Sequence, residues 1–99
     1  MEIAFGESDL QRAYAEPRYA LKLWNRAVAK KYLSTVQFIA LAQSWEQVKT
    51  YPPFRTHQLN WDLRGLWSMK LTGRWRVLVE LVDRETLAVM QEVSNHYDD

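Results

Sequence analysis

The sequence contains no cysteine, which excludes a disulfide framework, a thiolate metal site and a cysteine nucleophile. Glycine and proline number only three each and no low-complexity run occurs, so intrinsic disorder is not expected. No run of about 18 apolar residues is present, and the opening MEIAFGESDL lacks the charged flank and apolar stretch of a signal peptide. These absences predict a soluble, cytoplasmic protein with no membrane contact.

A large excess of charge of one sign is also missing. Thirteen Lys and Arg stand against twelve Asp and Glu, for a net charge of +1, far from the basic balance of a free-standing nucleic-acid binder. The 99 residues suffice for one compact domain, which we expect to span residues 1–99. Any nucleic-acid role must therefore depend on where the charges lie.

The first half of the chain has helical patterns. Alternation around Ile3 and Phe5 predicts a short opening strand, and a short helix over residues 10–15 should end before Pro17. Residues 18–43 contain no Gly or Pro, and apolar residues recur there at steps of three and four, which predicts one long helix. The apolar face of this helix comprises Leu21, Trp24, Val28, Tyr32, Val36 and Ile39.

The pattern then changes from helix to strand. Ser44 and Gln47 have the spacing of a capping box, which predicts a helical turn over residues 45–49 before Pro52 and Pro53. Strands are predicted over residues 56–59, 67–71, 75–82 and 87–93. The expected fold is an α+β domain with two N-terminal helices packed on one face of a small, mainly antiparallel sheet.

The register of the hairpin around Gly73 decides which side chains share a face. A two-residue loop would pair Met69 with Arg76 and mix apolar with charged side chains. A three-residue loop over residues 71–73, with Gly73 left-handed, separates them, and burying an unpaired Arg is costly. We therefore expect Trp67, Met69, Trp75, Val77 and Val79 on the apolar face, and Ser68, Lys70, Arg74 and Arg76 on the other.

The last strand has the same alternation. Leu87, Val89 and Val93 share one parity, and Met90, Glu92, Ser94 and His96 share the other. This parity predicts that His96 ends on the face of Arg76.

Several residues are candidates for function, each with a structural alternative. Lys70, Arg74 and Arg76 could hold a phosphate or form a solvated sheet face. The basic stripe Arg18, Lys22, Arg26 and Lys30 could contact RNA or solvate a helix. The two histidines, His57 and His96, could transfer protons or be ordinary surface or capping residues, and Trp61 could stack on a base or anchor a partner. No motif requires a cofactor or a metal.

One segment resembles a known family. HQLNWDLRGLWSMKLTGRWRVLVE is similar to the central part of HigB-type toxins of the RelE superfamily, the plasmid-maintenance killer proteins. The matching residues are His57, Leu59, Gly65, Trp67, Ser68, Lys70, Trp75 and Arg76. The order of expected strands and helices resembles the family over nearly all of the chain.

The resemblance implies a RelE-like fold and a toxin of a type II toxin–antitoxin system. Such a toxin is a ribosome-dependent endoribonuclease that cleaves mRNA and inhibits translation without a metal. A HigA-type helix-turn-helix antitoxin neutralises it, and operator DNA is contacted only through the antitoxin. The implied catalytic residues are His57, Arg76, His96 and Tyr97, with Lys70, Arg74, Arg64 and Trp61 as RNA-binding candidates.

Two segments depart from the family pattern. Asn60-Trp61 stands where the family has Lys-Gly, and Ser94-Asn95-His96 replaces Asp-Tyr-His, with a tyrosine only at Tyr97. Two alternatives therefore stay open. The chain could be a ParE-like toxin that inhibits gyrase, or a catalytically weakened toxin that mainly binds its antitoxin.

Overall fold

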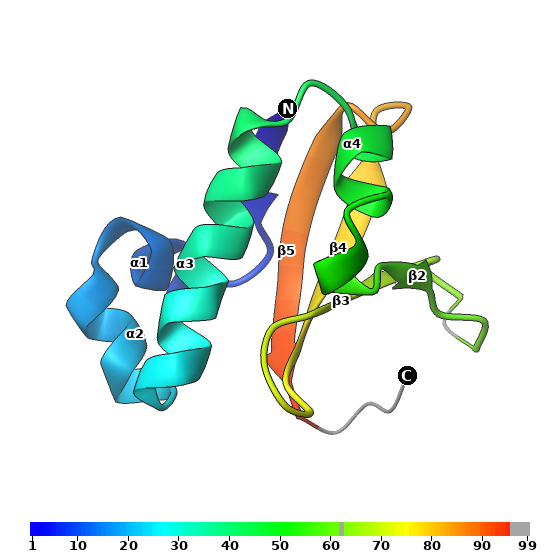
Figure 1. Ribbon diagram of the computed structural model, residues 1–99. Coiled ribbons are helices and arrows are strands. Elements are labelled where there is room, and N and C mark those ends of the chain that lie inside the picture. The colour runs from blue at the N-terminus through cyan, green and yellow to red at the C-terminus, as the bar shows by residue number, and fades with distance from the viewer. Residues whose placement is uncertain (62, 96–99) are drawn as a thin grey trace.

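The computed structural model describes residues 1–61 and 63–95 and shows an α+β arrangement (Figure 1). The helices in this part of the chain are α1 (Ser8–Ala15), α2 (Pro17–Leu23), α3 (Arg26–Leu41) and α4 (Trp45–Lys49), followed by the 3-10 turn η1 (Pro52–Phe54). The strands are β1 (Glu2–Phe5), β2 (His57–Gln58), β3 (Trp67–Lys70), β4 (Arg76–Val82) and β5 (Leu87–Ser94).

The five strands form one mixed sheet in the order β1-β5-β4-β3-β2. The pairs β2–β3, β3–β4 and β4–β5 are antiparallel, whereas β1 runs parallel to β5. The helices α1, α2 and α3 lie on one side of the sheet (Figure 1). The predicted opening strand and the mainly antiparallel sheet are therefore confirmed, and the strand expected over residues 56–59 is shorter.

The prediction of one long helix over residues 18–43 is wrong in one respect, because this segment forms two helices. α2 ends at Leu23, and the extended residues Trp24 and Asn25 separate it from α3. The side-chain oxygen of Asn25 accepts a hydrogen bond from the backbone N–H of Val28 at 2.9 Å. Asn25 is thus an N-cap, a residue type favoured there because it satisfies a helix donor that has no partner within the helix.

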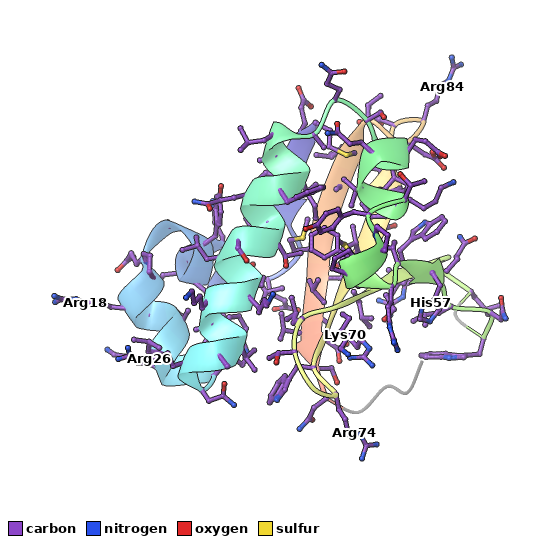
Figure 2. All side chains as sticks on the ribbon, viewed as in Figure 1. Arg18, Arg26, His57, Lys70, Arg74 and Arg84 are labelled. Carbon is purple, nitrogen blue, oxygen red and sulfur yellow. The ribbon has the colours of Figure 1, made fainter. Side chains whose placement is uncertain are left out.

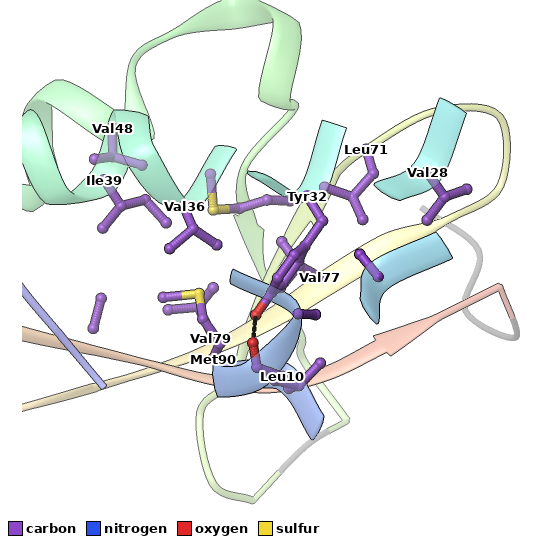
Figure 3. Packing of buried hydrophobic residues seen from close by; sticks show 14 of the residues in the cluster. Leu10, Val28, Tyr32, Val36, Ile39, Val48, Leu71, Val77, Val79 and Met90 are labelled. Atoms are coloured by element: carbon purple, nitrogen blue, oxygen red, sulfur yellow. Dashed lines mark hydrogen bonds between the residues drawn. The ribbon is translucent and has the colours of Figure 1, made fainter. Parts of the chain in front are cut away.

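The main core lies between the helices and the sheet (Figure 3). Tyr32 is completely buried, and its hydroxyl donates to the backbone carbonyl of Leu10 at 2.8 Å, which links α3 to α1. Most of the predicted apolar face is buried, but Leu21 is 48% exposed on α2, which runs in a different direction from α3 (Figure 1). The other core members include Val28, Val36, Ile39, Met69, Val77, Val79 and Met90.

The β3–β4 hairpin differs from the predicted register by two residues. Lys70 pairs with Arg76 and Met69 with Val77, so the three-residue loop is Thr72–Gly73–Arg74 instead of residues 71–73. Gly73 has the predicted left-handed conformation, with φ +58°. A shift of two residues keeps every strand side chain on its predicted face, since side chains alternate with period two. Arg74, however, lies in the turn and not on the sheet face.

β5 contains an irregularity that the alternation did not predict. Leu78 pairs with Glu92 and Val79 with Met90, which leaves Gln91 as an extra residue without an opposite partner on β4. The bulge reverses the expected parity on its N-terminal side. Ala88 and Met90 consequently belong to the core, while Val89 shares the opposite face with Glu92 and Ser94.

The segment between α3 and β2 follows the prediction in outline. Ser44 is the N-cap of α4 but its side chain makes no capping bond, and Gln47 accepts from the backbone N–H of Gln43 at 2.9 Å. The capping box is therefore only half formed, one residue earlier than expected. No helix in residues 1–61 or 63–95 is long and apolar enough to cross a membrane.

Candidate nucleic-acid interface

The face of the sheet opposite α3 carries two rows of candidate residues. Directly opposed residues of antiparallel strands point to the same side, with Cβ atoms about 5 Å apart. One row runs His57, Ser68, Leu78 and Glu92, and the next runs Lys70, Arg76 and Ser94. The pairing therefore brings His57, Lys70 and Arg76 onto one face, although 19 positions separate the first from the last in the sequence. Figure 2 shows His57 and Lys70 on the same side of the molecule.

Arg76 is largely buried on this face, at 7% exposure. One of its terminal nitrogens, Nη1, donates to the carbonyl of Gly73 at 3.1 Å and to that of Trp75 at 2.9 Å. The guanidinium therefore braces the β3–β4 turn and also brings a permanent positive charge beside Lys70. Arg76 has a structural use that the sequence did not indicate.

Lys70 is half-buried and lies next to Arg76 across the strand pair. An ammonium on a flexible stem can reach an anion in front of the sheet, while the neighbouring guanidinium is held by the turn. Within the part of the chain that the structure describes, Lys70 forms no ion pair with a carboxylate. Lys70 is thus the cation of the pair better suited to direct contact with a phosphate.

The ring of His57 is oriented by the chain that precedes β2. Its Nδ1 lies 3.0 Å from the carbonyl oxygen of Arg55. Because a carbonyl oxygen can only accept, Nδ1 carries the proton, and Nε2 is the basic nitrogen of the neutral ring. This arrangement gives His57 the tautomer that a general base requires at Nε2.

A small hydrophobic cluster supports this face beneath the loop that joins β2 to β3. Leu59, Leu66 and Leu78 are buried together, and the backbone N–H of Leu59 donates to the carbonyl of Leu66 at 2.8 Å. The face predicted to be polar therefore contains a second apolar core. Among the loop candidates, Trp61 is 60% exposed and Arg64 is exposed, so both are accessible to a partner.

Two arginines near this face differ from the sequence prediction. Arg74 lies in the exposed turn between β3 and β4 instead of on the strand, and Figure 2 shows it at the lower end of the molecule. Arg55 was not a candidate, yet it is exposed, left-handed with φ +46°, and two residues before His57. Continuing the β2–β3 register would set Arg55 opposite Lys70. In the sequence, Arg55 is marked only by lying two positions before His57. That spacing does not indicate a site unless the pairing of β2 with β3 is known.

His96 and Tyr97, the other two predicted catalytic residues, lie outside the described residues. Ser94, two positions before His96, is on the predicted face and pairs with Arg76. In residues 1–61 and 63–95 no group of three or more His, Asp or Glu side chains could hold a metal ion.

Comparisons with known proteins add no assignment. No protein-family model matches the sequence, and no curated protein matches it. The residues of this chain and their geometry are therefore the basis for assigning a function.

Proposed function

We propose that this protein is the toxin of a type II toxin–antitoxin system, a HigB-type member of the RelE superfamily that cleaves mRNA on the ribosome. The proposal is supported by the resemblance of residues 57–80 and by the α+β fold. The observation that carries it is the pairing of Lys70 with Arg76 beside His57 on one face of the sheet. The proposed partners are the ribosome, mRNA and a HigA-type antitoxin.

The proposed chemistry needs a base and a cation. Nε2 of His57 takes the proton from a ribose 2′-hydroxyl, whose oxygen attacks the adjacent phosphorus and forms a 2′,3′-cyclic phosphate. The bond to the 5′ oxygen breaks, and that oxygen takes up a proton. Lys70 stabilises the extra negative charge on the phosphate, and Arg76 adds its positive charge from the turn. In this proposal His96 or Tyr97 donates the proton to the leaving oxygen.

The test is brief induction of the protein followed by mapping of mRNA 5′ ends. Lys70→Gln should lower cleavage by about 100-fold and His57→Ala by about 100-fold or more, because each removes one of these roles. Arg84→Gln is the matched control, since Arg84 is an exposed arginine in the turn after β4, at the other end of the sheet (Figure 2). Circular dichroism spectra of all variants should match the wild type. Wild-type cleavage by both Lys70→Gln and His57→Ala would exclude this face as the site.

A second candidate is favoured by the burial of Arg76. Its bonds to the carbonyls of Gly73 and Trp75 explain this arginine without catalysis. The alternative function is a weakened toxin whose scaffold mainly binds a helix-turn-helix antitoxin. Harmless expression with unchanged mRNA ends and tight binding of that antitoxin would select it. Arrest of replication with unchanged mRNA ends would instead select a ParE-like inhibitor of gyrase.

A further inference from the structure

The charges of this nearly neutral chain are strongly segregated. Residues 17–45 contain five Lys and Arg and no Asp or Glu, which leaves eight cations against twelve carboxylates in the rest of the chain. This segment forms α2, the break and α3. The segment of α2 and α3 therefore carries a net charge of +5, while the rest of the chain carries −4. Such a field attracts acidic partners to one side of the molecule.

An apolar groove of about 330 Å³ lies between α2 and α3 within this basic region. Its floor consists of apolar side chains, of which Leu21 is 48% exposed. The floor residues are Pro17, Leu21, Ala29 and Leu33. An exposed leucine in a concave apolar surface is an unfavourable arrangement in water, and it favours a partner that covers it.

Three cations form the rim of the groove, and they are Arg18, Arg26 and Lys30. All three are exposed, and none forms an ion pair within residues 1–61 and 63–95. Figure 2 shows Arg18 and Arg26 on the side of the molecule away from His57 and Lys70. The groove is therefore separate from the sheet face that carries His57 and Lys70.

We infer that this groove binds an acidic amphipathic helix of a partner protein. Apolar side chains spaced along one face of such a helix fit between two adjacent helices, and its carboxylates meet the three rim cations. A nucleic-acid backbone would use the rim but gain nothing from the four apolar floor residues. The inference stands independently of RNA cleavage at the sheet face.

The probe is a fluorescein-labelled peptide of about 14 residues, with Leu at helical spacing and Glu elsewhere, measured by fluorescence polarisation. Leu21→Ser and Lys30→Glu should each weaken its binding about tenfold. The matched control is Lys22→Glu, because Lys22 is exposed on α2 next to Leu21 but does not line the groove. This control should weaken binding less than about threefold, the remaining long-range effect being screened by about 0.15 M salt.

Five results would overturn the inference. The first is absence of binding by the peptide up to about 1 mM. The second is an equal loss of peptide affinity in Lys22→Glu and Lys30→Glu, which would show general charge attraction. The third is equal binding of a peptide whose Leu residues are Ser. The fourth is an oligouridine that binds with the same sensitivity to Leu21→Ser, which would assign the groove to RNA. Dimerisation through the groove, detected as a doubled mass that Leu21→Ser abolishes, would assign it to a second copy.

Discussion

The buried hydroxyl of Tyr32 provides a sensitive test of the core. Tyr32→Phe removes one oxygen atom whose bond of 2.8 Å to the carbonyl of Leu10 joins α3 to α1 (Figure 3). A neutral buried hydrogen bond contributes about 1 kcal/mol net, and the carbonyl left without this partner raises the loss towards about 2 kcal/mol. For a domain of this size, that loss lowers Tm by about 5–10 °C.

The measurement is urea unfolding followed by circular dichroism at neutral pH. The urea concentration at the midpoint of unfolding should fall. The slope of the free energy of unfolding against urea concentration should stay the same, because the surface exposed on unfolding is unchanged. Tyr19→Phe is the control, since the hydroxyl of Tyr19 donates to Asp9 at 2.6 Å on the surface. The midpoint of this control should not move measurably. Equal midpoints for Tyr32→Phe and Tyr19→Phe would refute the reasoning from burial.

The pH dependence gives a second readout of the same residue. Burial raises the pKa of Tyr32 well above its ordinary value, so the folded protein keeps the neutral hydroxyl. The unfolded chain ionises near pH 10, so the stabilisation is complete below that pH and decreases as the pH rises above it. The decrease is at most about 1.4 kcal/mol per pH unit. The difference in stability between wild type and Tyr32→Phe should therefore shrink above about pH 10, and a constant difference would contradict this.

Three further predictions concern local structure and can be checked by thermal unfolding. Gly73→Ala should lower the free energy of unfolding by about 1 kcal/mol, because Gly73 has φ +58°; the added Cβ itself would meet nothing within 4 Å. Gly73→Asn should lower it less, because Asn tolerates this conformation. Asn25→Ala should lower the free energy of unfolding by about 1 kcal/mol, because it removes the cap of α3, whereas Asn25→Asp should keep most of that stability. Equal losses of stability in the two variants would exclude capping. Leu66→Ala should cost about 2–5 kcal/mol although it lies outside the main core, because Leu66 is completely buried against Leu59 and Leu78.

Some features follow from local sequence alone. Alternation along residues 67–70 and 76–82 determined which side chains face the helices, since a strand side chain can point to only two sides. Gly73 was recognisable as left-handed because residues with a Cβ rarely adopt that conformation. The helical segments were also visible in their spacing, as were the ends marked by Pro17 and Pro52.

Other features required the tertiary structure. The register of the β3–β4 hairpin is two residues away from the prediction, and parity cannot detect this because a shift of two preserves the faces. The bulge at Gln91 has no local signature in the sequence, and because of it Val89 lies on the face of the sheet that points away from the main core. The break at Trp24 and Asn25 contains neither Gly nor Pro, and it leaves Leu21 exposed in the groove.

The candidate interface shows the same division. The sequence alone determined that Lys70 and Arg76 share a face, because both belong to one hairpin and to one parity of it. Only the tertiary structure decided that His57 joins them, since β2 pairs with β3 across the loop that buries Leu59 and Leu66 beneath Leu78. It also decided that Arg76 is bound to the turn and that Arg74 leaves the sheet. The physical reason is that pairing between strands depends on contacts distant in the sequence, whereas alternation depends only on the residues of one strand.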